Sequence, residues 1–192
     1  MTKYFKELTT FTCYRSVSIT WVDLSANTKL QYLDCINNNL SNLDLSKNTA
    51  LTKLDVSDNQ LTKLNVSKNT KLTTIYLHMN KITDTNMKTF VSGLPKVTKG
   101  ELRVYSEGAS TEKNDFSSIN VNAAKTKEWT VKYYNGTSWL DYKGSATAIS
   151  DVNVDEPAEF DVNAPAYNLR GERVGNDYKG IVIQKGRKYI RK

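Results

Sequence analysis

Apolar residues recur along this chain with a period of 21 residues. Three consecutive segments, beginning at Val22, Leu43 and Leu64, align without a gap. Each contains the pattern L-x-x-L-x-L-x-x-N-x-L, in which x is mostly polar. The positions are filled by Leu30, Leu33, Cys35, Asn38 and Leu40, then by Leu51, Leu54, Val56, Asn59 and Leu61, then by Leu72, Ile75, Leu77, Asn80 and Ile82. A repeat of this length predicts a solenoid, because one such unit has too little core to be stable alone.

Alternating apolar and polar residues in each unit predict short strands with one buried face. The first run includes Leu33 and Cys35, and a second in-out-in run starts at Val22, Leu43 and Leu64. We therefore expect each coil to carry two strand-like faces and no full helix. An earlier, damaged copy keeps the apolar residues Leu8, Phe11, Cys13 and Ile19, so four turns are expected.

The pattern resembles the leucine-rich repeat, in particular the 21-residue bacterial subclass that nests L-x-x-L-x-[LC]-x-x-N-x-L with L-x-x-L-D-L. This resemblance implies an α/β repeat fold: a leucine-rich repeat solenoid of short 21-residue coils with parallel strand faces, over residues 1–92. It also accommodates cysteine at the third apolar position, where Cys13 and Cys35 stand. We interpret both cysteines as small buried hydrophobic residues, with a disulfide as the alternative.

Two columns of asparagine, one period apart, accompany the apolar columns. Asparagine has amide donors and an acceptor, so a stacked column can satisfy backbone groups that the turns leave unpaired. We interpret both columns as structural: Asn38, Asn59 and Asn80 form one, and Asn27, Asn48 and Asn69 form the other.

After Asp84 the period ends, and residues 93–144 are expected to form a C-terminal cap that covers the last coil. A short helix after Asp84, a strand at 101–105, a helix at 114–127, a strand at 129–134 and an Asn135-Gly136 turn are predicted. Asp115 is the candidate N-cap of the second helix, with Phe116, Ile119 and Ala123 on its apolar face. The order of these motifs resembles the end of secreted leucine-rich repeat proteins from Bacteroidetes.

Residues 145–166 contain five acidic residues and no basic one, which predicts an acidic linker. Its D-V-N-V-D-E run lacks the glycine and final glutamate of an EF-hand, so a calcium site is not favoured. Residues 167–192 predict a small all-β module, which resembles a C-terminal module related to sorting domains of secreted and surface proteins of Bacteroidetes. This tail could be an export or anchoring signal.

The formal net charge of +7 is divided between segments. Residues 1–144 carry +6, the linker −5 and the tail +6, so no single basic face for nucleic acid is expected. No stretch approaches the roughly 18 apolar residues of a membrane helix, which argues against membrane insertion. Residues 1–6 lack an apolar secretion signal. The chain is therefore either cytosolic or a piece of an exported precursor, and the resemblances favour an extracellular or cell-surface location.

No familiar catalytic motif is present, and we expect neither an enzyme nor a cofactor or metal site. Repeat proteins vary the outward residues of their strands without disturbing the core. Here those columns include tyrosines, an exposed isoleucine and two stacked carboxylates, which suit recognition. We predict a ligand-binding face of Tyr14, Tyr32, Asp34, Ile36, Asp55, Tyr76 and His78.

The sequence thus favours a non-enzymatic, monomeric extracellular module that binds a protein ligand, such as a host extracellular protein, through its strand face. Two alternatives stay open. One is a glycan-binding surface protein that stacks sugars on the cap aromatics Tyr133, Tyr134, Trp139 and Tyr142. The other is a rigid surface spacer whose tail serves export or anchoring.

Overall fold

A computed structural model describes residues 6–13, 19–144, 166–167, 173–175, 180–184 and 187–191. The chain divides into two compact units, Met1–Ser145 and Ala146–Lys192. Most of the predicted acidic linker at 145–166 lies outside the described residues.

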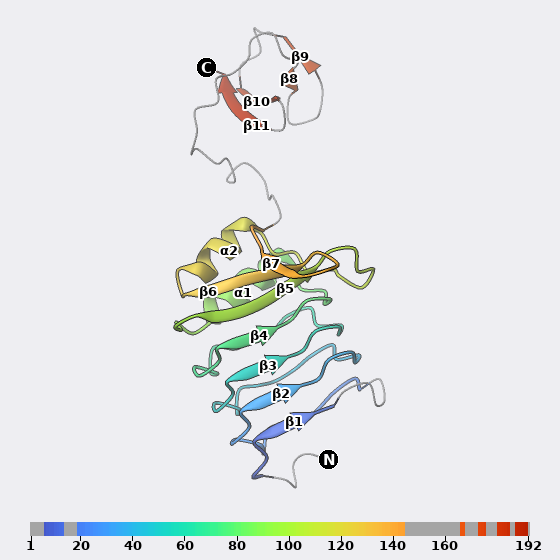
Figure 1. The fold of residues 1–192 in the computed structure, drawn as a ribbon, viewed down its shortest axis with the longest axis vertical. Helices are drawn as coiled ribbons and strands as arrows, with labels where there is room; N and C mark the ends of the chain where they lie inside the picture. Colours follow the sequence, from blue (N-terminus) through green and yellow to red (C-terminus); the bar gives the residue numbers. More distant parts are fainter. Residues whose placement is uncertain are drawn as a thin grey trace. The chain divides into compact units, whose positions relative to one another are not determined.

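The first unit is built on a seven-stranded sheet with the order β1-β2-β3-β4-β5-β6-β7 (Figure 1). The first six strands are parallel and in sequence order, and β7 returns antiparallel to β6. The strands are β1 (Thr10–Thr12), β2 (Tyr32–Asp34), β3 (Lys53–Asp55), β4 (Thr74–Tyr76), β5 (Gly100–Ser106), β6 (Trp129–Tyr134) and β7 (Trp139–Asp141).

The register of the sheet reproduces the 21-residue period of the sequence. Tyr32 pairs with Lys53, and Lys53 pairs with Thr74, so each coil repeats the one before it. The damaged first copy follows the same register, because Thr10 pairs with Tyr32. Four short coils therefore precede the longer strand β5.

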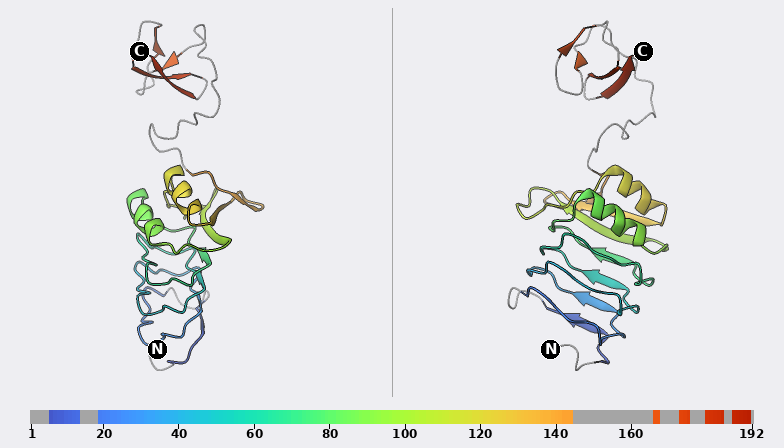
Figure 2. Two further views of the ribbon diagram at one scale, coloured as in Figure 1. Left: turned by 90° about the vertical axis from the view of Figure 1, so that its left-hand side faces the viewer. Right: turned by 180° about the vertical axis from the view of Figure 1, so that it is seen from behind.

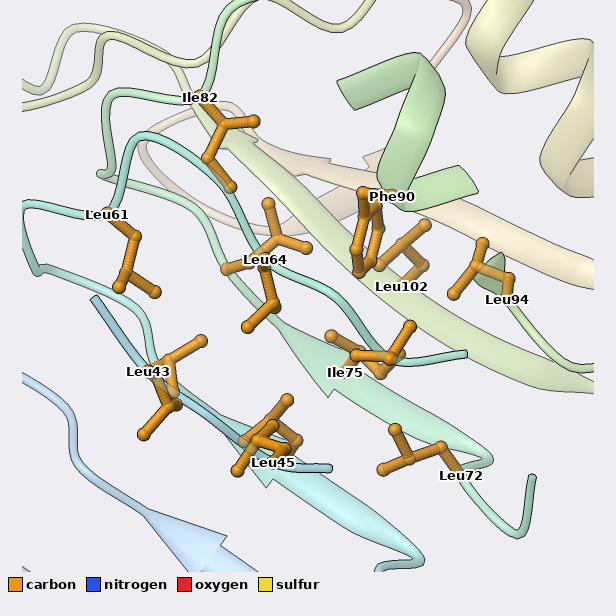
Figure 3. Close-up of a cluster of buried hydrophobic side chains, with 14 of the residues drawn as sticks. Leu43, Leu45, Leu61, Leu64, Leu72, Ile75, Ile82, Phe90, Leu94 and Leu102 are labelled. Carbon is orange, nitrogen blue, oxygen red and sulfur yellow. The ribbon is translucent and has the colours of Figure 1, made fainter. Parts of the chain in front are cut away.

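Inward side chains of the strands meet the second apolar run of each coil in one continuous core. Leu33, Leu54 and Ile75 are fully buried and align across β2, β3 and β4. In Figure 3, Leu43, Leu45 and Leu64 lie among these columns. Each fully buried leucine stabilises the fold by about 1.5–3 kcal/mol, so the core depends on stacking of the coils rather than on any one of them.

The second run of each coil is buried in the predicted in-out-in manner, with Leu43 and Leu45 buried and Asp44 exposed. It does not form a strand, however, so each short coil has one strand rather than two. The backbone turns there instead, as the amide of Asn48 donates to the carbonyl of Leu45.

The asparagine column at Asn38, Asn59 and Asn80 connects neighbouring coils. The Asn59 amide donates to the Cys35 carbonyl of the preceding coil, and its Oδ1 accepts from the Leu40 amide. Asn80 makes the corresponding bonds one coil later, to Val56 and Leu61. In the second column, Asn48 and Asn69 donate to carbonyls of the coil before each of them. Both columns are structural, as the spacing predicted.

The first asparagine column continues with Asn114, which lies after the sequence period has ended. Asn114 donates to the carbonyls of Leu77 and Val104 and accepts from the Ile82 amide. Phe116 follows it and is fully buried, as Leu40 is after Asn38. The coil containing β5 is thus a fifth repeat with an insertion between Val104 and Asn114.

Helices replace the second run in the last two coils. They are α1 (Asp84–Gly93) and α2 (Ser118–Lys125), and both cover the face of the sheet that the short coils cover with turns (Figure 2). The Lys127 ammonium donates to the carbonyls of Val91, Ser92 and Leu94 and so joins the end of α1 to the chain after α2.

Helix α2 differs in detail from its prediction. It begins after Ser117, whose side chain accepts from the Asn120 amide, and not after Asp115. Its buried residues are Asn120, Val121 and Ala124, whereas Ile119 is 48% exposed. Of the predicted apolar face, Phe116 is buried but precedes the helix, Ala123 packs against the core, and Ile119 was wrong. The face was assigned from Phe116, which is not part of the helix.

The described residues of the second unit include four short strands in the order β11-β10-β8-β9, all paired antiparallel. They are β8 (Ala166–Tyr167), β9 (Arg173–Val174), β10 (Gly180–Gln184) and β11 (Arg187–Arg191).

Candidate functional site

The outward residues of β2 to β5 form two rows across the sheet, and they hold most of the predicted site residues. Each short strand has a buried central residue between two partly exposed ones. We call these outward residues the strand face: Tyr32, Lys53, Thr74 and Glu101 in one row, and Asp34, Asp55, Tyr76 and Arg103 in the next.

Aromatic rings and cations alternate across this face. The Lys53 ammonium lies 4.9 Å from the centre of the Tyr32 ring and 5.5 Å from that of Tyr76. The Arg103 guanidinium lies 4.0 Å from the Tyr76 ring and 4.5 Å from the Trp139 ring. Cation–π contacts of this kind contribute about 0.5–1 kcal/mol each at exposed sites, so they order the long side chains.

Neither Lys53 nor Arg103 was among the predicted site residues, although both belong to the outward columns. The 21-residue spacing places Lys53 between Tyr32 and Thr74, with Tyr76 in the neighbouring row, and could have identified it. Arg103 could not be aligned by period, because it lies beyond the last regular repeat.

Two carboxylates lie opposite each other on β2 and β3. Asp34 accepts hydrogen bonds from the Tyr32 hydroxyl at 3.0 Å and from the Ile36 amide at 3.2 Å. Asp55 accepts from the Ser57 hydroxyl at 2.6 Å and from the Ser57 amide at 3.0 Å. Both side chains are therefore held in place and point away from the core.

Titration of these groups is perturbed by their surroundings. Burial raises the pKa of Asp55, and the neighbouring Asp34 charge acts in the same direction, against the hydrogen bonds from Ser57. The pKa of Tyr32 is raised to about 12, first by burial and then by its hydrogen bond to Asp34. At neutral pH the Tyr32 hydroxyl is therefore a hydrogen-bond donor.

His78 was predicted as a surface residue of the binding face, and this was wrong. It is only 8% exposed, because Trp139 packs against it with ring centres 4.8 Å apart in an edge-to-face contact. Burial, and after it the nearby Arg103 charge, lowers the pKa of His78 to about 4. Its Nδ1 atom is buried and has no hydrogen-bond partner among the described residues. His78 therefore packs beneath Trp139 and is not an exposed residue of the sheet.

The other predicted site residues divide into two groups. The structure brings together Tyr32, Asp34, Ile36, Asp55 and Tyr76, all partly exposed on adjacent coils. Tyr14 lies outside the described residues.

The aromatic residues considered for glycan binding contact one another and the core. The ring of Tyr142 stacks on that of Tyr105 at 5.6 Å and meets Phe116 edge-on. Tyr134 lies 5.4 Å from Trp139, whose ring also contacts Arg103. Much of the ring surface that a sugar would need is thus occupied by protein.

Cys13 and Cys35 occupy equivalent positions in adjacent coils. Both are buried and free, and their sulfur atoms lie 2.8 Å apart. Among the described residues there is no group of three or more His, Cys, Asp or Glu side chains that could hold a metal ion. The described part of the chain also contains no helix long and apolar enough to cross a membrane.

Comparison with models of protein families finds no match, and neither does comparison with curated proteins. Five chains of solved structures do match. One is the functional domain of InlJ from Listeria monocytogenes, which includes a cysteine ladder. It is 30% identical, with a TM-score of 0.52 over 69% of this chain and 26% of that one. This chain spans about a quarter of that relative's length, and the likeness supports a leucine-rich-repeat-like α/β fold.

Proposed function

From this leucine-rich-repeat-like fold, we propose that the chain is a non-enzymatic recognition module that binds a protein ligand through its strand face. The observation that carries the proposal is the alternation of tyrosine rings and cations across the two rows of the strand face, in the order Tyr32, Lys53, Tyr76 and Arg103. Tyrosine and arginine are the residue types that dominate binding energy at protein interfaces. Rigid strands hold them in advance, so little side-chain entropy is lost on binding.

The rest of the unit supports this arrangement. Residues 93–144 act in this proposal as a C-terminal cap, which closes the last coil and places Trp139 against the end of the strand face. Ser57, whose hydroxyl donates to Asp55, is fully buried, and His78 is buried with no partner at Nδ1 among the described residues. This burial supports a non-enzymatic role.

We further propose an extracellular or cell-surface location. This rests on the resemblance to secreted leucine-rich repeat proteins of Bacteroidetes and on the likeness to the InlJ domain, and the ligand would then be an extracellular protein, such as a host protein. We favour a protein ligand over a glycan. A glycan would stack on the cap aromatic rings, and those rings are packed against other rings.

The test uses the intact 192-residue chain, immobilised and exposed to a panel of extracellular proteins and a glycan array. The variant Tyr32→Ala with Tyr76→Ala removes both rings that flank Lys53. The control, Lys47→Ala with Lys68→Ala, changes two exposed residues in the turns that follow the second apolar run. Thermal melting of each variant checks that the fold is retained.

We expect a protein partner whose affinity falls at least tenfold in the tyrosine variant and less than twofold in the control. A partner bound equally well by the tyrosine variant would place the site elsewhere. A glycan partner lost in Trp139→Ala would favour the glycan alternative and overturn the proposal.

A further inference from the structure

Charged groups at the two ends of the sheet differ in how they are neutralised. Towards the cap, two cations of the strands have acidic partners: Arg103 contacts Glu101 at 2.6 Å, and Lys132 contacts Asp141 at 2.7 Å. On β2 and β3, by contrast, Asp34 and Asp55 face each other with no ion pair to either carboxylate among the described residues.

Lys53 is close to the two carboxylates but does not neutralise them with an ion pair. Lys53 is on the same strand as Asp55, and its ammonium could have neutralised the two carboxylates. Instead it lies over the rings of Tyr32 and Tyr76. Asp55 receives both of its hydrogen bonds at Oδ1, so its Oδ2 atom keeps its acceptor capacity.

We propose that the strand face over β2 to β4 docks a protein segment that presents an arginine side chain to Asp34 and Asp55. This inference rests on the proposed function and names the chemistry of the partner. Neighbouring strands lie about 4.8 Å apart, so the two carboxylates are close enough for one planar guanidinium to reach both. Its N–H donors can reach Asp55 Oδ2 and the remaining lone pairs of Asp34, whose oxygens each accept one hydrogen bond already, and its face can stack on the Tyr32 ring.

Lysine fits this position less well than arginine. An ammonium is a compact charge that cannot form the two parallel hydrogen bonds of a guanidinium. Lys53 itself is a competing cation beside the site, and a second positive charge is disfavoured while it stays there. Replacing Lys53 by methionine, which keeps much of the stem, should therefore strengthen binding of an arginine peptide several-fold.

The experiment titrates the ¹⁵N-labelled chain with two short peptides, acetyl-Gly-Arg-Gly-amide and the same peptide with citrulline. Citrulline has nearly the shape of arginine but no charge, so the comparison isolates the guanidinium. We expect the arginine peptide to shift the amide signals of β2 and β3 and to bind at least tenfold more tightly than the citrulline peptide. Asp34→Asn with Asp55→Asn should abolish that difference, whereas Asp44→Asn on the second run should preserve it.

Three results would overturn the inference. These are equal binding of the citrulline peptide, an arginine response unchanged in the double variant, and preferential shifts of the same amides by calcium chloride at equal concentration. Its failure is separable from that of the proposed function. A protein partner lost with Tyr32→Ala and Tyr76→Ala but kept with the two asparagine substitutions would uphold recognition and reject the arginine site.

Discussion

Replacing Asn59 by alanine should destabilise the solenoid more than any change to its surface. The side chain of Asn59 donates to the carbonyls of Cys35, Val56 and Ser57 and accepts from the Leu40 amide. Alanine can do neither. The Leu40 amide is then buried without its partner, whereas the Cys35 carbonyl keeps its hydrogen bond from the Asn38 side chain.

The expected loss follows from the Leu40 amide and from the lost bond to the preceding coil. A buried backbone group left without a partner costs about 1–3 kcal/mol and a lost hydrogen bond about 1 kcal/mol, so Asn59→Ala should lower the free energy of unfolding by about 2–4 kcal/mol. Because coils are stabilised mainly by their neighbours, damage at the central coil weakens the interfaces on both of its sides. The unfolding transition should therefore shift as a whole rather than split at one end.

Urea unfolding followed by circular dichroism measures this loss. Asn39→Ala is the matched control, because Asn39 is an exposed asparagine of the preceding coil, and it should change the free energy of unfolding by less than about 0.5 kcal/mol. Equal effects of the two substitutions, or a loss below about 1 kcal/mol for Asn59→Ala, would refute the structural interpretation of the column.

Three further predictions concern single residues. Met79 has φ +54°, in the left-handed region that Asn37 and Asp58 occupy in the preceding coils, so Met79→Asn should raise the free energy of unfolding by about 1 kcal/mol; an unchanged urea midpoint would contradict this. The pKa of His78 is lowered to about 4, so folding excludes a proton that the unfolded chain binds, and stability should fall by about 3 kcal/mol as pH drops from 6.5 to 4. His78→Gln should remove that part of the pH dependence of stability. If His78 of the folded chain instead titrates near pH 6.5 by NMR, this prediction is wrong. The buried thiols of Cys13 and Cys35 should resist an aqueous thiol reagent in the folded chain and both react in urea, whereas rapid labelling without urea would show that the first coil opens.

The repeated part of the fold could be predicted because local and global signals agree there. Leu33, Leu54 and Ile75 recur at one spacing, and the same spacing sets the register of the strands. The second run was predicted with the right burial but the wrong backbone, because alternation reports which side chains point inward and not which hydrogen bonds form.

The coil containing β5 was harder to predict because an insertion hides its period. Asn114 and Phe116 occupy the positions that Asn38 and Leu40 occupy in an earlier coil, but a longer loop separates them from Val104. Likewise, outward positions could be inferred from alternation, whereas coverage by a distant residue could not. His78 is outward by sequence yet buried by Trp139, which is 61 residues away and reaches it only through the β6–β7 hairpin.

Site-specific photo-crosslinking tests the recognition surface most directly. Thr74 lies on the strand face between Tyr32 and Trp139, whereas Asn65 is exposed on the second run of the same coil. A photoreactive phenylalanine at either position, in the full chain mixed with extracellular proteins, reports which side the ligand touches. We predict a specific protein adduct from position 74 and none from position 65. An adduct from position 65 alone would contradict binding through the strand face.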